Sequence, residues 1–286
     1  MSENTQLPEQ IVDIKPKYRK DYQPSQYLIK QTNLDFQLHD DHVIVETELE
    51  VYRNPNDRLN KFESLELNGI EIELIELSIN GQRLTTECYS AHPEGLSIHK
   101  VSEQFTLKTK AKIFPQKNTS LEGLYTSNQK FCTQCEAEGF RKITYYLDRP
   151  DVMSEFFVRV EGDKKKYPLL LSNGNPIEKG NTSNGRHFVK WHDPFPKPSY
   201  LFALVAGDLD CLEENFVTAS GRDVLLQIFV DKGKLDQCNF AMQSLINSMK
   251  WDEEKFGREY DLDRYMIVAV SDFNMGAMEN KGLNIF

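Results

Sequence analysis

The sequence lacks any apolar run close to the ~20 residues that a membrane-spanning helix needs. Its first 20 residues are polar and of mixed charge, without the apolar stretch of a secretory signal. Cysteine is scarce and odd in number, with five in 286 residues, which is not the composition of a small disulfide-stabilised secreted domain. We therefore expect a cytoplasmic protein with reduced thiols and no membrane association.

Positive charge is also in deficit. The chain has 34 lysines and arginines against 44 aspartates and glutamates, a net charge of −10. Such a chain has no general attraction to phosphate backbones, which argues against a nucleic-acid partner, whereas a cationic ligand such as a free amine is favoured. The apolar content of 39% and charged content of 27% are those of a globular protein, and the length corresponds to about two average domains.

Alternation of apolar and polar residues dominates the first part of the chain. Residues 42–51 and 105–113 place valine, leucine and other apolar residues on one face and charged residues mostly on the other, which indicates half-buried strands. Further short strands are expected at 156–160, 167–171 and 186–192, and the Asn-Gly pairs at 68–69 and 80–81 predict hairpins. After a polar lead-in over residues 1–24, we therefore predict a mainly β N-terminal domain, residues 1–208, as an antiparallel sandwich or saddle.

The pattern changes over residues 209–286. Residues 235–256 carry an apolar stripe at helical spacing, and Gly257 is a natural stop. The apolar run 266–270 is consistent with a strand buried on both faces. The stripe and the strand need partners that we do not expect the remaining residues to supply, so we predict an incomplete α/β domain with an exposed helix face.

The segment after that strand contains Gly276-Ala-Met-Glu-Asn280. This pentapeptide is identical to the GAMEN exopeptidase motif of the gluzincin zinc aminopeptidases, and the flanks 251–257 and 263–273 are similar to that family as well. From about residue 18 to 286 the chain resembles the bacterial aminopeptidase N type of this family. The resemblance implies a β-rich N-terminal domain followed by the start of a thermolysin-like catalytic domain. It also implies a monomeric, broad-specificity enzyme that removes alanine-like, neutral or basic residues from peptides.

A second motif lies at 121–151, an acidic, glycine-containing segment with Cys132 and Cys135. Zinc and redox roles are open for this CxxC pair, but no second pair supplies further zinc ligands and the surroundings are not βαβ, so ordinary loop cysteines are favoured. The segment closely resembles the substrate-facing loop of the family. By that resemblance Glu136 binds the α-amine of the substrate and Gln134 lines the same site. We expect Glu138, Arg141 and Asp148 to form an ordinary structural network.

The resemblance also assigns residues to the substrate site. Glu279 is the second carboxylate for the amine, the Gly276-Ala277 backbone lies along the substrate main chain, and Met275 walls the first side-chain pocket. Met278 and Asn280 complete the set of substrate-binding residues. The physical rationale is that only a peptide with a free α-amine, whose pKa is about 7.7–8.0, presents a cation to two carboxylates.

Hydrolysis in this family requires zinc, usually held by H-E-x-x-H on a helix and a downstream glutamate. None of the six histidines stands in such a frame, and His39 and His42 are expected at the surface. We therefore expect no metal ligand and no catalytic residue in this chain, with the zinc ligands downstream of residue 286, and no peptidase activity from the chain alone. Two alternatives are a stand-alone, non-catalytic β-sandwich binding or scaffold module and a related epoxide hydrolase, the latter disfavoured by the intact GAMEN sequence.

Overall fold

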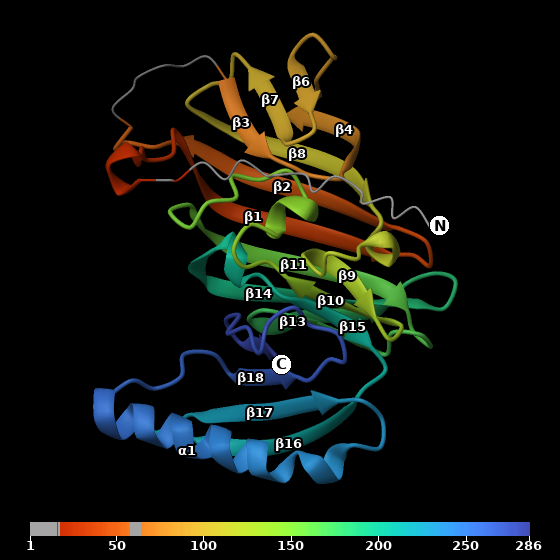
Figure 1. Cartoon of the computed structure of the whole chain (residues 1–286), viewed down its shortest axis with the longest axis vertical. Helices are drawn as coiled ribbons and strands as arrows, with labels where there is room; N and C mark the ends of the chain where they lie inside the picture. The colour runs from red at the N-terminus through yellow and green to blue at the C-terminus, as the bar shows by residue number, and fades with distance from the viewer. Residues whose placement is uncertain (1–15, 17, 58–63) are drawn as a thin grey trace, which may run out of the picture.

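A computed structural model describes residue 16, residues 18–57 and residues 64–286. Most of the lead-in predicted for residues 1–24 lies outside these residues. The described part contains four sheets and one α-helix (Figure 1). The largest sheet has eight strands, in the spatial order β13 (Asn175–Asn181), β14 (Arg186–Pro198), β11 (Met153–Asp163), β1 (Tyr27–Leu38), β2 (Val43–Arg53), β8 (Gln104–Ile113), β4 (Glu73–Ile79) and β5 (Gln82–Arg83).

The alternating segments form this large sheet as predicted. Burial alternates along β2 and β8, with the apolar residues in the core and the charged ones half-exposed. One part of the prediction is wrong, because the sheet is not wholly antiparallel. The strands β1 and β11 pair in parallel, with Leu34 opposite Val158, although more than a hundred residues separate them. Neighbouring residues along a strand carry no signal for such a distant parallel partner.

Two smaller sheets complete the β-rich part. One contains β3 (Ser64–Asn68), β7 (Gly95–His99) and β6 (Tyr89–His92), and the other contains β12 (Leu169–Ser172), β15 (Leu204–Gly207), β10 (Lys130–Gln134) and β9 (Gly123–Ser127). The mainly β character of residues up to about 208 is confirmed.

The two Asn-Gly pairs behave differently. Asn80 and Gly81 both have positive φ, 49° and 78°, and turn β4 into β5 as predicted. The hairpin predicted at Asn68-Gly69 is wrong, because β3 and β4 belong to different sheets. Asn68 exchanges backbone hydrogen bonds with Tyr146 instead, and a Cβ on Gly69 would lie 2.4 Å from the Tyr145 ring. This glycine therefore serves close packing and not a turn.

The C-terminal part consists of a sheet ordered β16 (Asp210–Val217), β17 (Asp223–Val230), β18 (Arg264–Val268) and β19 (Leu283–Ile285), with α1 (Asn239–Phe256) on its outer face (Figure 1). Gly257 ends the helix in the left-handed conformation, as predicted. The prediction that the helix stripe lacks a partner is wrong. Met242, Leu245 and Met249 are buried against apolar side chains of β16 and β17, because these two strands supply the opposing surface.

The other face of this sheet packs on the β-rich part. Phe229, Met266 and Val268 belong to the same hydrophobic core as the large sheet, while Ile267 faces the helix side. The strand predicted at 266–270 is observed at Arg264–Val268 and is covered on both faces, so the expectation that it lacks partners in this chain is wrong as well. The hydrophobic core continues across residue 208, so a domain boundary there stays a prediction. No described helix is long and apolar enough to cross a membrane.

Candidate substrate site

The loop that carries Glu136 has an exposed tip on a buried base. Glu136 follows β10 in a tight turn closed by the Gly139 N–H donating to Cys135 O at 2.9 Å. Cys135 and Phe140, on either side of the turn, are fully buried, and the Phe140 ring packs edge-on against the Tyr146 ring. The base is therefore held by the core while the Glu136 carboxylate is exposed to solvent.

A close approach of two backbones shapes this loop. A Cβ on Gly139 would lie 2.5 Å from Gln134 O and 2.8 Å from the Gly123 nitrogen, so no larger residue fits without movement. Gly123 pairs with Gln134 across the β9–β10 ladder. The two glycines allow the start of β9 to lie directly against the turn that presents Glu136.

Gln134 is the predicted site residue with the most unusual surroundings. Its side chain is buried, and neither its amide oxygen nor its amide nitrogen has a hydrogen-bond partner among the described residues. Buried amides are almost always paired, with protein, water or ligand. An unpaired amide two residues before Glu136 is a polar group that a ligand could satisfy.

The sequence predicted that both cysteines of this segment are loop residues, which is wrong for Cys132 and holds for Cys135, at the start of the turn. Cys132 lies within β10 and Cys135 directly follows it, and both are fully buried. Burial raises the pKa of the Cys132 thiol to about 12 and that of Cys135 well above its usual range, so both stay protonated at neutral pH. A structural role in the core is the interpretation that this environment favours.

The GAMEN segment runs along the edge of the C-terminal sheet. Met278 and Ile285 pair antiparallel, while Ile285 itself lies in β19 next to β18. Along the segment Met278 and Asn280 are buried, while Glu279 between them is exposed, as expected for neighbouring residues on opposite faces of a strand. The Asn280 side-chain oxygen is a second buried polar atom without a partner among the described residues.

The residues before Met278 are exposed. Met275 is 54% exposed, a high value for a large apolar side chain, and Gly276 and Ala277 are also exposed. A Cβ on Gly276 would have no neighbour within 4 Å. The backbone of this stretch is thus open to an approaching ligand.

Hydrogen bonds tie the two halves of the predicted site to one another. The Ser127 hydroxyl donates to Asp272 Oδ2 at 2.6 Å and accepts from the Asp272 N–H at 3.1 Å. The Tyr125 hydroxyl donates to Asp272 O at 2.9 Å, and the Asn274 amide donates to Leu121 O at 3.0 Å. The segment leading to GAMEN is therefore attached to the β9–β10 hairpin, whose open end bears Gln134 and Glu136. That Glu136 and Glu279 face one another stays a prediction.

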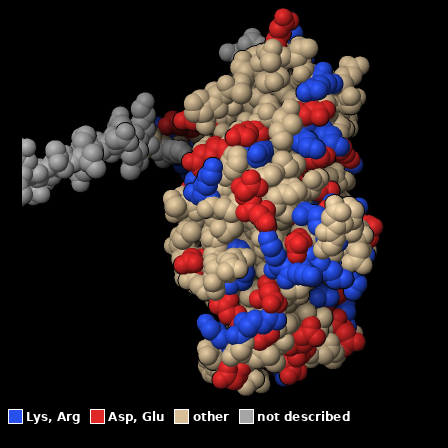
Figure 2. All heavy atoms as spheres, turned by 90° about the vertical axis from the view of Figure 1, so that its right-hand side faces the viewer, with Lys and Arg blue, Asp and Glu red and all other residues tan. Residues whose placement is uncertain are grey.

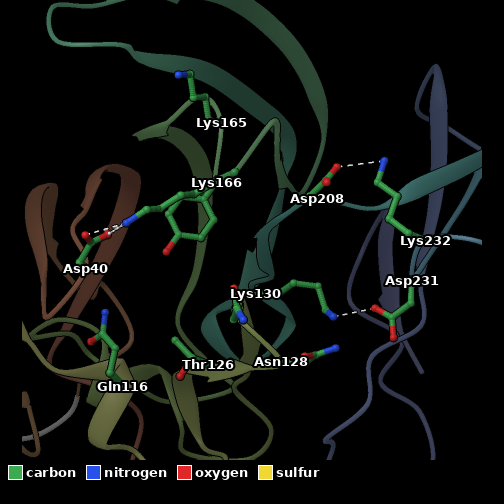
Figure 3. Close-up of a pocket in the computed structure, with 12 residues that line it drawn as sticks. Asp40, Gln116, Thr126, Asn128, Lys130, Lys165, Lys166, Asp208, Asp231 and Lys232 are labelled. Atoms are coloured by element: carbon green, nitrogen blue, oxygen red, sulfur yellow. Dashed lines mark hydrogen bonds and ion pairs between the residues drawn. The ribbon is translucent and has the colours of Figure 1, made fainter.

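A cavity of about 980 Å³ lies at the same junction, but it contains none of the predicted site residues. Figure 2 shows lysine and arginine side chains gathered in the lower half of one face, with acidic side chains between them. In the cavity, ion pairs join Lys166 to Asp40, Lys130 to Asp231 and Lys232 to Asp208 (Figure 3). These ion pairs neutralise most of the lysine charges that line the cavity. The cavity is therefore not a strong anion-binding site.

The polar network predicted to be structural is confirmed as such. The Asp148 carboxylate is buried and accepts hydrogen bonds from Ser199 Oγ at 2.6 Å and Arg141 Nε at 3.0 Å. Arg141 also lies 3.3 Å from the Glu138 carboxylate. Arg141 and the two carboxylates thus balance one another's charges, and the network needs no ligand to be stable.

The six histidines do not assemble a metal site in the described part of the chain. No described group of three or more histidine, cysteine, aspartate or glutamate side chains could hold a metal ion. His39 and His42 stack on one another at the β1–β2 turn, and His192 binds Glu155. The described residues therefore contain no set of side chains that could hold zinc.

Comparisons with known proteins show the family of the chain. A family model described as the peptidase M1 N-terminal domain matches residues 23–201, which is more than half of the chain, and the peptidase family M1 domain matches residues 240–286. The chain belongs to the M1 peptidase family. M1 relatives include the aminopeptidases N of Caulobacter vibrioides, 54% identical, and Escherichia coli, 53% identical, over 93% and 94% of this chain.

A solved M1 structure agrees in fold. The crystal structure of Legionella pneumophila aminopeptidase A in complex with aspartic acid superposes with a TM-score of 0.91 at 33% identity and covers 94% of this chain. The chain spans 30% of the length of the two aminopeptidases N and 32% of the Legionella chain. The match confirms a β N-terminal domain followed by the start of an M1 catalytic domain.

Sequence reasoning missed the residues that join the two parts of the site. Ser127, Asp272 and Asn274 are polar residues in turns or next to them, and nothing in their spacing distinguishes them from solvated loop residues. Lys130 and Asp231 were missed for the same reason. Only the three-dimensional pairing of segments about 145 positions apart shows their role.

Proposed function

We propose that this chain supplies the amine-recognition part of a zinc aminopeptidase that releases N-terminal residues from peptides. The observation that carries the proposal is the attachment of the segment that leads to GAMEN to the hairpin that bears Gln134 and Glu136. The family membership and the names of the relatives support the same class of reaction. The substrate class is a peptide with a free N-terminal amine.

The proposed recognition uses charge. The α-ammonium of the substrate lies between the exposed carboxylates of Glu136 and Glu279, and each ion pair at 4 Å is worth about 4 kcal/mol at an effective dielectric constant of about 20, before desolvation costs. An internal peptide bond brings no charge and leaves both carboxylates unpaired. The Gln134 amide, which is buried and has no hydrogen-bond partner among the described residues, is proposed to bind a polar group of the same ligand.

The peptide main chain is proposed to lie along Gly276 and Ala277. This stretch continues the sheet edge at which Met278 pairs with Ile285, and an extended chain can add to such an edge through its own backbone groups. Met275, largely exposed here, then contacts the first side chain of the substrate. An apolar wall of this kind favours small or neutral N-terminal residues.

The hydrolytic step is proposed to use zinc. When bound, zinc would activate the water that attacks the peptide bond. Because the described residues contain no fitting donor set, the ligands are proposed to lie in sequence beyond residue 286. We also propose that the enzyme acts in the cytoplasm, which the five free cysteines support.

The proposal is tested by reading the gene past the Phe286 codon and assaying the whole encoded protein on an alanyl amide. We expect an H-E-x-x-H sequence, chelator-sensitive hydrolysis, and no hydrolysis of the N-acetylated substrate. The 286-residue chain alone is the matched control and should be inactive. An uninterrupted reading frame whose product lacks hydrolysis would contradict the proposal, and a stop codon after Phe286 would favour a non-catalytic β-sandwich module.

A further inference from the structure

We propose that Ser127 and Asp272 are positioning residues that set the distance between the two carboxylates of the amine site. This inference rests on the proposed function above. Neither side chain is part of the GAMEN sequence or of the Glu136 loop. Their role follows from the way they join the two segments that carry those carboxylates.

The contact between the two residues is reciprocal. Ser127 Oγ donates to the Asp272 carboxylate at 2.6 Å and accepts from the Asp272 main-chain N–H at 3.1 Å. The first bond is charge-assisted and fixes the side chain, and the second fixes the backbone of the same residue. Ser127 is fully buried and Asp272 is exposed, so the contact is shielded from water on the Ser127 side.

Flanking contacts turn this pair into a rigid joint. On one side the Tyr125 hydroxyl donates to Asp272 O, and on the other the Asn274 amide donates to Leu121 O. These partners come from β9 and the residues just before it, and Gly123 of β9 pairs directly with Gln134 of β10. Movement of Asp272 relative to the hairpin would therefore break several hydrogen bonds at once.

A second connection comes from the same end of the hairpin, where Lys130 pairs with Ser127 across the β9–β10 ladder. The buried Lys130 ammonium lies 2.6 Å from Asp231 at the end of β17, as Figure 3 shows, and Ser271 Oγ donates to the other oxygen of that carboxylate at 3.3 Å. Ser271 directly precedes Asp272. The hairpin is thus joined to Asp272 directly through Ser127 and to Ser271 through the Asp231 carboxylate.

Each residue of this joint precedes one of the two proposed amine ligands in the sequence, Ser127 before Glu136 and Asp272 before Glu279. Glu136 comes two residues after the end of β10, and Glu279 comes seven residues after Asp272. The loop that bears Glu136 and the segment that leads to Glu279 are both attached to the hairpin. A shift at Ser127–Asp272 therefore changes the distance between the two carboxylates. Because an ion pair weakens as its charges move apart, such a shift would weaken the binding of the α-ammonium.

The test uses the full-length protein with an alanyl amide as substrate. We expect Ser127→Ala and Asp272→Ala each to raise KM about tenfold or more with little change in kcat. Asp272→Asn keeps an oxygen acceptor for Ser127 and should recover most of the affinity. The double alanine variant should be no worse than either single variant, because both remove the same contact.

Two controls separate positioning from folding. Asp208→Asn removes an exposed ion pair with Lys232 at the same junction without touching residues 271–274, and it should leave KM unchanged. Thermal unfolding shows whether the alanine variants stay folded, because a purely structural loss lowers the active fraction and not the affinity.

The outcomes distinguish the two proposals. If Glu279→Gln raises KM while Ser127→Ala and Asp272→Ala stay within twofold of wild type, this inference is overturned and the proposed function stands. If the wild-type protein does not hydrolyse the substrate, the proposed function fails and this inference fails with it. A raised KM in both alanine variants, recovered by Asp272→Asn, supports the positioning role.

Discussion

Met278 and Ile285 exchange both of their backbone hydrogen bonds, at 2.8 and 3.0 Å, and this pairing places the GAMEN segment at the edge of the C-terminal sheet. Because side chains alternate along an extended segment, Met278 enters the core while Glu279 stays exposed. The same pairing leaves Gly276 and Ala277 just beyond the last ladder bond. The fold therefore presents a carboxylate and an open stretch of backbone side by side.

Gly276→Ala should separate stability from substrate binding. A Cβ at this position meets nothing within 4 Å, and its φ is not in the left-handed region, so the unfolding free energy should change by no more than about 0.5 kcal/mol. A substrate backbone lying against Gly276 would meet the new methyl group, so KM in the full-length protein should rise at least about tenfold. Thermal unfolding and steady-state kinetics measure the two effects, and an unchanged KM would argue against a substrate chain at Gly276.

Gly139→Ala is the matched comparison. Here the new Cβ would lie 2.5 Å from Gln134 O, so the loop that bears Glu136 must move. We expect a loss of several kcal/mol of stability, because the atoms in the way are backbone atoms. If Gly139→Ala melts like the wild type, the close packing described for this loop is wrong.

The buried ion pair of Lys197 and Asp193 should be essential as a pair. The two charges lie 3.0 Å apart with side chains that are 2% and 0% exposed, and the ammonium also lies 3.8 Å from the centre of the Phe156 ring. Lys197→Met leaves the Asp193 carboxylate buried without its counter-charge and should cost about 3–5 kcal/mol. Chemical denaturation of the variant measures this loss.

The double replacement Lys197→Met with Asp193→Leu should recover most of that stability, since a buried pair can often be exchanged for apolar residues at little cost. Lys232→Met is the surface control, because Lys232 is 55% exposed and its ion pairs contribute little. A double variant as unstable as Lys197→Met would show that the loss is one of packing and not of an uncompensated charge.

The same lysine predicts a pH dependence. Burial lowers the pKa of Lys197 to about 8 from an ordinary value of 10.5, against the opposing effect of Asp193. Between these pH values the unfolded chain binds more protons than the folded one, so the unfolding free energy should rise with pH in this window relative to the double variant. Denaturation at pH 7.5 and pH 10 measures the difference, and parallel curves for wild type and double variant would contradict it.

The sequence predicts the local features of the fold well and the distant contacts poorly. The strands around residues 43–53 and 104–113, the turn at Asn80-Gly81 and the helix end at Gly257 follow from alternation and backbone preference, which are local properties. The parallel pairing of β1 with β11 is not local, and neither is the burial of the helix stripe against β16 and β17. The residues that neighbour a position in the sequence do not indicate which distant segment packs or pairs with it.

The candidate site shows the same division. The GAMEN residues and Glu136 were found because they resemble a family motif, and the structure places Glu136 and Glu279 in exposed positions. Resemblance could not indicate Ser127 or Asp272, whose contact spans 145 positions. The Gln134 amide has no hydrogen-bond partner among the described residues, and this property depends on the surrounding core, which the sequence alone does not show.

The most direct test of the amine site is the Michaelis constant of the full-length protein for an alanyl amide, measured for wild type, Glu136→Gln and Glu279→Gln. Glutamine keeps the size of each side chain and removes its charge. We expect each variant to raise KM at least about tenfold at pH 7, because each loses one ion pair with the α-ammonium. A KM within twofold of wild type for both variants would contradict it.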